Sequence, residues 1–342
     1  MADSRLRRRW LLLACFGLAI VSLWPGPVVS APASTPSVLD NASCENCHQA
    51  QWKEWKASRH SDAGENAPFN FEYEGHPGDW CLNCHAPRMS SDNLPKATAR
   101  KQGVDCLSCH VREGKLYSTS KAQTSPHKTI ADSSFGDTNM CAGCHQFNFP
   151  ELDHKGSLIQ YTAQTMQDTA NEFRRSTIAK AGGSCTDCHM PKGRHTFPGA
   201  YSAEQVQKAL RVDLCQAPTS LQVTITNELL AHNLPSGGVN RALVVQLWEG
   251  SRPQAVREYR LERRFIGPIG KRVKTKDTTL KPGKSATWNV RRSYLGAKTP
   301  TELHLRSQFF LGTDPNRHKP TSKVDIEHQK IPWKSITECA AK

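Results

Sequence analysis

The stretch Cys44-Glu45-Asn46-Cys47-His48 is the first copy of the pattern that decides how this 342-residue chain folds. The same Cys-x-x-Cys-His pattern returns at 81–85, 106–110, 141–145 and 185–189, and we number the five copies as motifs one to five. The motifs hold ten of the 13 cysteines: Cys44, Cys47, Cys81, Cys84, Cys106, Cys109, Cys141, Cys144, Cys185 and Cys188. One chemical unit is therefore repeated along the first half of the chain.

The spacing within each motif has a chemical reason. Two thiols at this distance bond the two vinyl groups of one porphyrin, and the histidine that follows ligates the iron from one face. Zinc sites do not require a histidine directly after each cysteine pair, and iron–sulfur clusters use denser cysteines without it. The pattern predicts five covalently attached c-type haems with these proximal ligands: His48, His85, His110, His145 and His189.

The N-terminus has the pattern of an export signal. Four arginines between residues 5 and 9 precede an uncharged stretch from Trp10 to Trp24, which Pro25-Gly26-Pro27 interrupts. Small residues around Ser30 suit cleavage there, so residues 1–30 are interpreted as a secretory signal peptide. We therefore expect a periplasmic protein. An uncleaved N-terminal membrane anchor facing the periplasm is the alternative.

Charge divides the rest of the chain. The full chain has a net charge of +14, and residues 211–342 alone hold 23 Lys and Arg against 11 Asp and Glu, a net +12. We expect a linker at 31–43, a pentahaem cytochrome c domain at 44–212 and a basic domain at 213–342. Export makes nucleic acid an unexpected partner. The basic domain is expected to attract an acidic redox protein, an anionic membrane surface or an anionic ligand, and a solvated surface without a partner is the alternative.

Two helices are predicted in the haem region, which is otherwise irregular with few strands. The first covers 49–60, where Trp52 and Trp55 share a face at i, i+3 spacing. The second covers 158–180, with a less polar stripe that includes Met166 and Phe173. Five porphyrins would supply the apolar filling that aliphatic side chains provide elsewhere.

The C-terminal region has the pattern of an all-β, sandwich-like domain. Apolar residues alternate with polar ones at 221–225, 259–265, 286–290 and 303–311, while 242–248 is apolar enough for a deeply buried strand. Cys215 and Cys339 lie near the two ends of this region, and an oxidising compartment permits a disulfide between them. Two unpaired buried thiols are the alternative.

Nine histidines remain outside the motifs, and we expect second iron ligands among them. Our candidates include His127, His154 and His232, although His232 could instead bond a haem propionate. His60 lies 12 residues after His48, about 18 Å along a continuous helix at 1.5 Å per residue. It would therefore ligate a neighbouring haem. His76, His304, His318 and His328 are expected at the surface.

The stretch from motif one to His60, followed by Ser61-Asp62-Ala63, resembles the opening of the cytochrome c-554 type of multihaem cytochrome. The segment after motif five, with Met190-Pro191 and then His195-Thr196-Phe197, is similar to the last motif of the same group. The resemblance covers about 44–200 and implies that His60 and His195 are distal ligands. That family is tetrahaem, so a fifth motif is a departure. The loop from Ala231 to Gly238 resembles a loop in β domains appended to some multihaem cytochromes.

Electron transfer is the function that this pattern favours. Closely packed, mostly bis-histidine haems relay single electrons between a donor and an acceptor, because six-coordinate iron offers no position for a substrate. The alternative is reduction of a small nitrogen or sulfur compound at one five-coordinate haem. Pentahaem nitrite reductases carry a Cys-x-x-Cys-Lys motif at that haem, and this chain has none. We therefore expect an electron carrier rather than an enzyme.

Overall fold

The computed structural model describes residues 41–75, 78–119, 127–250, 255, 257–295, 299–313 and 320–340. The predicted signal peptide with Cys15, and the predicted linker up to residue 40, lie outside these ranges. So do His76 and His318. Within the described ranges, no helix has both the length and the apolar composition needed to cross a membrane.

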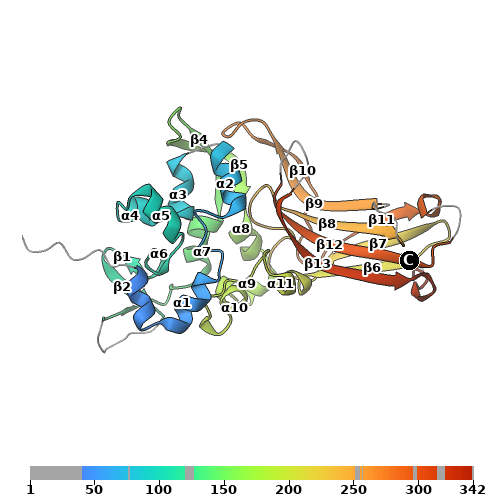
Figure 1. Ribbon diagram of the computed structural model, residues 1–342, viewed down its shortest axis with the longest axis horizontal. Helices are drawn as coiled ribbons and strands as arrows, with labels where there is room; N and C mark the ends of the chain where they lie inside the picture. Colours follow the sequence, from blue (N-terminus) through green and yellow to red (C-terminus); the bar gives the residue numbers. More distant parts are fainter. Residues whose placement is uncertain are drawn as a thin grey trace, which may run out of the picture. The chain divides into compact units, whose positions relative to one another are not determined.

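Short elements make up the part of the chain that carries the five motifs (Figure 1). The helices are η1 (Asn41–Asn46), α1 (Gln49–Lys56), α2 (Ala67–Gly75), α3 (Asp79–His85), α4 (Arg88–Ser91), α5 (Lys96–Gln102), α6 (Cys106–His110), α7 (Thr138–His145), α8 (Thr169–Arg174), α9 (Thr177–Lys180), α10 (Cys185–His189), η2 (Pro191–Gly193) and α11 (Ala203–Gln207). The strands are β1 (Val111–Arg112), β2 (Lys115–Ser118), β3 (Ile130–Ala131), β4 (Phe147–Leu152) and β5 (Leu158–Gln167).

Four of the motifs end a short helix at their histidine, namely in α3, α6, α7 and α10. Residues i, i+3 and i+4 lie on one face of a helix, so both sulfurs and the imidazole of each motif point the same way. Helices this short are not stable alone, and side chains just before them accept the unpaired backbone N–H groups. Asp105 Oδ1 accepts from Ser108 N at 2.9 Å, and Asp137 Oδ1 accepts from Met140 N at 2.8 Å.

Helix α1 brings Trp52 and Trp55 together with ring centroids 4.9 Å apart, which confirms the predicted shared face. The helix ends at Lys56, four residues earlier than predicted. The hydroxyl of Ser61 donates to Lys56 O at 2.9 Å and to Ser58 O at 3.0 Å. These side-chain bonds occupy the last carbonyl groups and turn the chain away from the helix axis.

The predicted helix at 158–180 is wrong in its first half. Residues Leu158–Gln167 form strand β5, which pairs antiparallel with β4, and only α8 and α9 follow as helices. Tyr161, Thr162 and Thr165 favour strands, and pairing with β4 outweighs the helical periodicity of the apolar positions. The predicted end of the helical segment is confirmed, since α9 stops just before Gly182, which has φ +88°.

The haem region has only a small apolar core of its own among the described residues. Its buried cluster consists of Phe69, Leu82, Ala86 and Ala99. Such a core is small for so long a segment, and this agrees with the expectation that porphyrins supply much of the filling.

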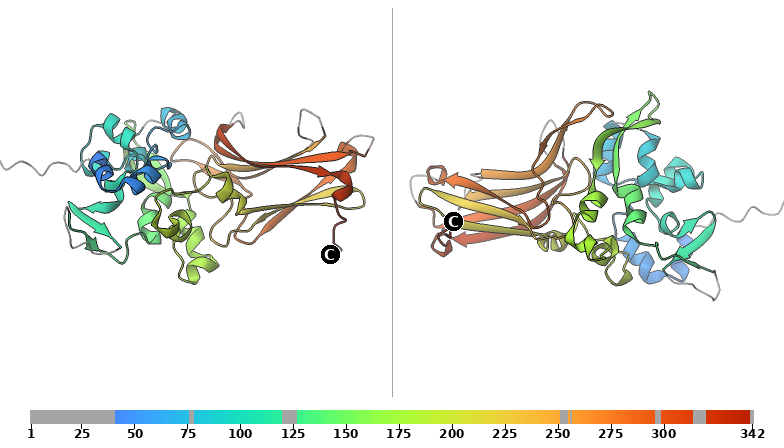
Figure 2. Two further views of the ribbon diagram at one scale, coloured as in Figure 1. Left: turned by 60° about the horizontal axis from the view of Figure 1, so that its bottom comes forward. Right: turned by 180° about the vertical axis from the view of Figure 1, so that it is seen from behind.

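The C-terminal region consists of antiparallel strands, which confirms the predicted β domain. Its strands are β6 (Leu210–Gln216), β7 (Ser220–Asn227), β8 (Ala242–Glu249), β9 (Arg257–Ile266), β10 (Val273–Asp277), β11 (Ser285–Arg291), β12 (Glu302–Thr313) and β13 (Pro320–Pro332), with short helices η3 (Arg292–Leu295) and η4 (Trp333–Ser335). One sheet has the order β10-β9-β8-β12-β13 and the other β11-β7-β6. Both sheets can be followed in Figure 2.

One apolar core lies in this domain and includes residues of both sheets. Leu243, Val245 and Leu247 of β8 contribute alternate positions, and β7 contributes Leu221, Val223 and Ile225. All six are fully buried. The predicted period of two therefore places every second residue of these strands in the core.

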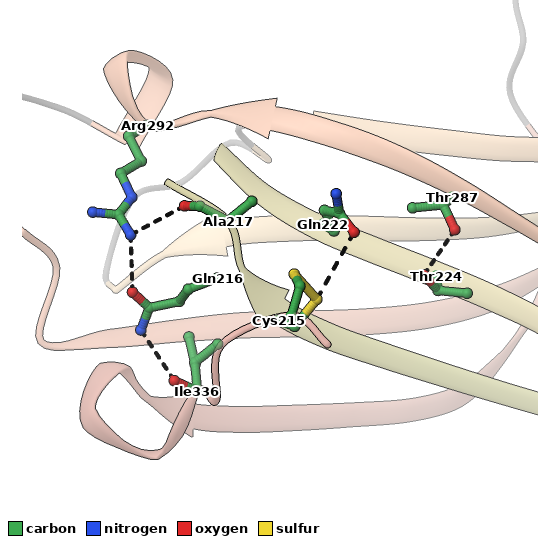
Figure 3. The surroundings of a disulfide bond; sticks show 9 residues. Cys215, Gln216, Ala217, Gln222, Thr224, Thr287, Arg292 and Ile336 are labelled. Carbon is green, nitrogen blue, oxygen red and sulfur yellow. Dashed lines mark hydrogen bonds between the residues drawn. A yellow bond between two sulfur atoms is a disulfide. The ribbon is translucent and has the colours of Figure 1, made fainter. Parts of the chain in front are cut away.

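A disulfide joins Cys215 of β6 to Cys339, with Cα atoms 4.9 Å apart, and the prediction of this bond is confirmed. Figure 3 shows the bond beside the side chain of Gln216. Gln216 N donates to Thr337 O at 2.8 Å, and Cys339 N donates to Gln216 O at 2.9 Å. The bond and these contacts attach the C-terminal segment to the first strand of the β domain.

Candidate haem-binding site

The proximal histidines are oriented by backbone carbonyl groups. His85 Nδ1 lies 2.8 Å from Ala63 O, His110 Nδ1 lies 2.9 Å from Tyr117 O, and His189 Nδ1 lies 2.6 Å from Pro198 O. A carbonyl oxygen only accepts, so Nδ1 carries the proton in each case. Nε2 is left with a free lone pair, which is the state needed to ligate a metal.

Four proximal histidines face a second histidine ring. The ring centroids are 6.0 Å apart for His48 and His127, 6.4 Å for His145 and His60, 6.3 Å for His110 and His195, and 6.3 Å for His189 and His232. In every pair, the partner comes from a distant part of the chain.

These separations fit two imidazoles on one iron. With metal–nitrogen bonds of about 2 Å and about 1.1 Å from each nitrogen to its ring centre, the two centroids of a bis-histidine haem lie about 6.2 Å apart. The four observed values fall within 0.2 Å of this estimate. The chain thus leaves room for an iron atom between the rings of each pair.

Burial keeps the histidines of one pair neutral. Removal from water lowers the pKa of His145 to about 3 and that of His60 to about 4, with nearby histidines adding to the effect. A neutral imidazole is the form that ligates iron. At neutral pH neither ring would have to lose a proton before binding.

Two of the predicted distal histidines, His195 and His60, are held by contacts that the sequence did not reveal. Glu54 of α1 accepts from His195 N and from Arg194 Nε, both at 2.8 Å. Val104 N donates to His60 O at 2.8 Å, and the neighbouring Gly103 has φ +62°, where a side chain would collide with that same oxygen. The segment before motif three and helix α1 therefore position histidines that face the proximal histidines of motifs four and three, respectively.

His154 is not brought to a proximal histidine. The structure places it on the exposed turn between β4 and β5, next to Asp153, whose Oδ1 accepts from Lys155 N and Ser157 N. This position argues against the predicted role of His154 as a distal ligand. Of the histidines that were not predicted as ligands, His304 and His328 lie on β12 and β13 of the β domain, with their nitrogens 3.2 Å apart.

His85 of motif two has a different neighbour from the other proximal histidines. The ring of Phe69 stacks on it with centroids 4.2 Å apart and an interplanar angle of 24°. A ring stacked in this way lies beside the imidazole and not across an iron from it. Among the described residues, which do not include His76, no histidine ring faces His85 as in the four pairs.

Sulfurs of different motifs lie near one another. Cys84 lies close enough to Cys144 to affect its ionisation, and the same holds for Cys141 with Cys185 and for Cys44 with Cys106. These thiols stand for the thioether sulfurs of attached haems. Motif four therefore lies against motifs two and five, and motif one lies against motif three.

The β domain contributes to this cluster through the loop between β7 and β8. His232 lies on that loop, and its Nδ1 contacts Asn233 O at 2.9 Å. The buried carboxylate of Glu172 on α8 accepts from Ser236 Oγ at 2.7 Å and from Asn233 N at 3.2 Å. Burial raises the pKa of Glu172. No signal in the sequence singles out Glu172, which falls within the predicted helix at 158–180.

Comparisons with known proteins agree with this geometry. A family model described as cytochrome c554 and c-prime matches residues 43–111, which contain motifs one to three. The chain is 23% identical over 216 residues to the cytochrome c-type protein TorY of Haemophilus influenzae, covering 62% of this chain and 50% of that protein. The match thus spans about half the length of TorY. Cytochrome c-554 of Nitrosomonas europaea is 24% identical over 198 residues, covering 50% of this chain and 83% of that protein.

A solved structure extends the likeness to the whole fold. The penta-heme cytochrome c552 of Thermochromatium tepidum superposes with a TM-score of 0.65, covering 86% of this chain and 98% of that one at 18% identity. So extensive a match takes in both the motif region and the β domain. The chain is therefore similar to cytochrome c-554 in its first three motifs and to a pentahaem cytochrome in its fold.

Proposed function

We propose that this chain is an exported pentahaem cytochrome that relays electrons between redox partners, with a sandwich-like β domain attached to the haem cluster. The four histidine pairs carry this proposal, because irons bound at both axial positions exchange electrons without binding substrate. The proximity of motif cysteines supports a continuous path, with motif four next to motifs two, three and five and motif one next to motif three.

A haem count combined with rapid reduction tests this proposal. A pyridine haemochrome assay on the purified protein should give five haems per chain. In a stopped-flow experiment with a protein donor, all five should become reduced by way of the haem that the donor contacts. A count below five, or haems that stay oxidised at equilibrium with a strong donor, would contradict the proposed relay.

Docking of an acidic partner on the basic β domain remains part of the proposal. Arg257 and Arg291 are exposed and suit a charge-reversal test. Arg263 and Arg264 do not, since Arg263 donates to Met166 O at 3.2 Å and Arg264 pairs with Glu262 at 2.6 Å. Electrostatic steering predicts that an acidic donor reduces the double variant Arg257→Glu/Arg291→Glu more slowly than the native protein. The reduction rate of the variant should also depend less on salt concentration. Unchanged rates would leave this surface without a partner.

A second candidate function is reduction of a small nitrogen or sulfur compound at the haem of motif two. The observation that favours it is the surroundings of His85, whose ring is stacked on Phe69 instead of facing a histidine within the described residues. Nitrite, hydroxylamine and sulfite should then change the spectrum of one haem. His76→Ala supplies the control. A new high-spin signal in this variant would show that His76 is the second axial ligand of that iron in the native protein.

A further inference from the structure

Arg241 occupies an unusual place for a cation. It directly precedes β8, at the end of the loop that carries His232, and is half-buried by the protein chain. Its Nη1 donates to Ser236 O at 3.4 Å, a long and weak bond. The guanidinium also lies against Gly237, which has φ +93° and where any side chain would collide with Nη1. The guanidinium thus lies against the backbone of this loop.

The surroundings of Arg241 are haem ligands from three motifs. Its charge acts on His85 of motif two, on His145 of motif four and on His232, which faces motif five. The polar groups that act most on Arg241 itself are the phenol of Tyr201 and a second cation, Arg263.

A half-buried cation loses part of its hydration, which is costly unless an anion pairs with it. Tyr201 and Arg263 supply no such anion at neutral pH. Haems do, because each brings two propionates, and a guanidinium binds a carboxylate through two parallel hydrogen bonds. The proximity of the cysteines places motifs two, four and five together, which is where Arg241 lies.

We propose that Arg241 is the countercharge for haem propionates at the junction of motifs two, four and five. The inference rests on the haem content proposed above for these motifs. A fixed positive charge close to an iron favours the ferrous state, because adding an electron removes one positive charge from the centre. Arg241 would accordingly raise the reduction potentials of the haems it adjoins, while leaving the two haems of motifs one and three nearly unchanged.

Potentiometric titration of the holoprotein, followed by haem absorbance, tests the assignment in Arg241→Gln, Arg241→Lys and a control, Arg306→Gln. Arg306 lies on β12, with its guanidinium over the ring of Trp248 at 4.2 Å. We expect Arg241→Gln to shift the reduction equilibrium of two or three haems at least tenfold toward the oxidised form, which is about 59 mV for one electron. Arg241→Lys should shift them less, and Arg306→Gln should match the native protein.

Native potentials in a fully loaded Arg241→Gln protein would overturn the assignment. If Arg241→Gln fails to retain its haems, the haem content of Arg241→Lys distinguishes the two explanations. Haem retained in Arg241→Lys supports a need for positive charge, whereas haem lost from both variants would make Arg241 a packing residue. The native protein is also titrated with sodium sulfate. Potentials that change with sulfate only while Arg241 is present would mean that the anion comes from solution, which overturns the propionate assignment. The haem count of the native protein, measured first, separates these outcomes from a failure of the proposed function.

Discussion

Removing the carboxylate of Glu172 should release the β-domain loop that carries His232. Two donors bond the same oxygen of this buried side chain, Ser236 Oγ at 2.7 Å and Asn233 N at 3.2 Å. A hydrogen bond to a charged group contributes about 1.5–3 kcal/mol, and burying the charge offsets part of the sum. We expect Glu172→Ala to lower the free energy of unfolding by about 3 kcal/mol.

Denaturant unfolding and electron paramagnetic resonance measure the two consequences. The loss of stability follows from the shift in unfolding midpoint, and release of His232 should turn part of one low-spin haem signal into a high-spin signal. Glu172→Gln keeps an acceptor oxygen at the same place and should cost less than about 1 kcal/mol.

Glu204→Ala is the matched control, because Glu204 pairs with Lys208 at the surface with its side chain 79% exposed. Such an exposed pair contributes about 0.5 kcal/mol. Equal losses in Glu172→Ala and Glu204→Ala, with every haem still low-spin, would refute the reasoning that Glu172 holds the loop.

Further predictions concern the buried ion pair, the disulfide and pH. Arg88→Met should cost about 3–5 kcal/mol in chemical unfolding, because it leaves Asp105, fully buried at 3.0 Å from Arg88, without its cation; a cost under about 1 kcal/mol would be contrary to this. Cys215→Ser opens a loop of 124 residues and should lower stability by about 4–5 kcal/mol, and reduction of the native protein should reproduce that loss. Because burial raises the pKa of Glu172 above 4.5, its contribution favours the native state below pH 4.5 and is lost as pH rises through the raised pKa. Glu172→Gln should remove this slope, and an unchanged pH profile would contradict it.

The spacing of residues in the sequence predicted the local features of the site, namely the proximal histidines and the strands of the β domain. The Cys-x-x-Cys-His repeat fixes where each proximal histidine lies, and alternation at 221–225 and 242–248 marks strands β7 and β8. His60, His127, His195 and His232 were all named from the sequence, and each now lies opposite a proximal histidine. The number of histidines outside the motifs and the resemblance to the family were enough to name these residues. Neither indicated which proximal histidine each one faces.

What the sequence did not reveal depends on long-range contacts. Leu158–Gln167 has apolar residues at helical spacing, yet it is a strand because β4 lies beside it. The partners of Glu54 and Glu172 lie more than 60 residues away in the sequence. Arg241 acts on histidines that belong to or face three different motifs. Nothing in their local sequence differs from that of an ordinary surface charge. His154 shows the converse, because a histidine close to several motifs in sequence lies on an exposed turn.

Low-temperature electron paramagnetic resonance of the oxidised protein tests the central claim, that four irons are each bound by two histidines. With the haem count known, spin quantitation should give at least four low-spin haems per chain. Single His→Ala variants at His60, His127, His195 and His232 should each convert one of them to high spin. A native protein with fewer than four low-spin haems, or variants whose low-spin signals all persist, would contradict the ligand pairs described here.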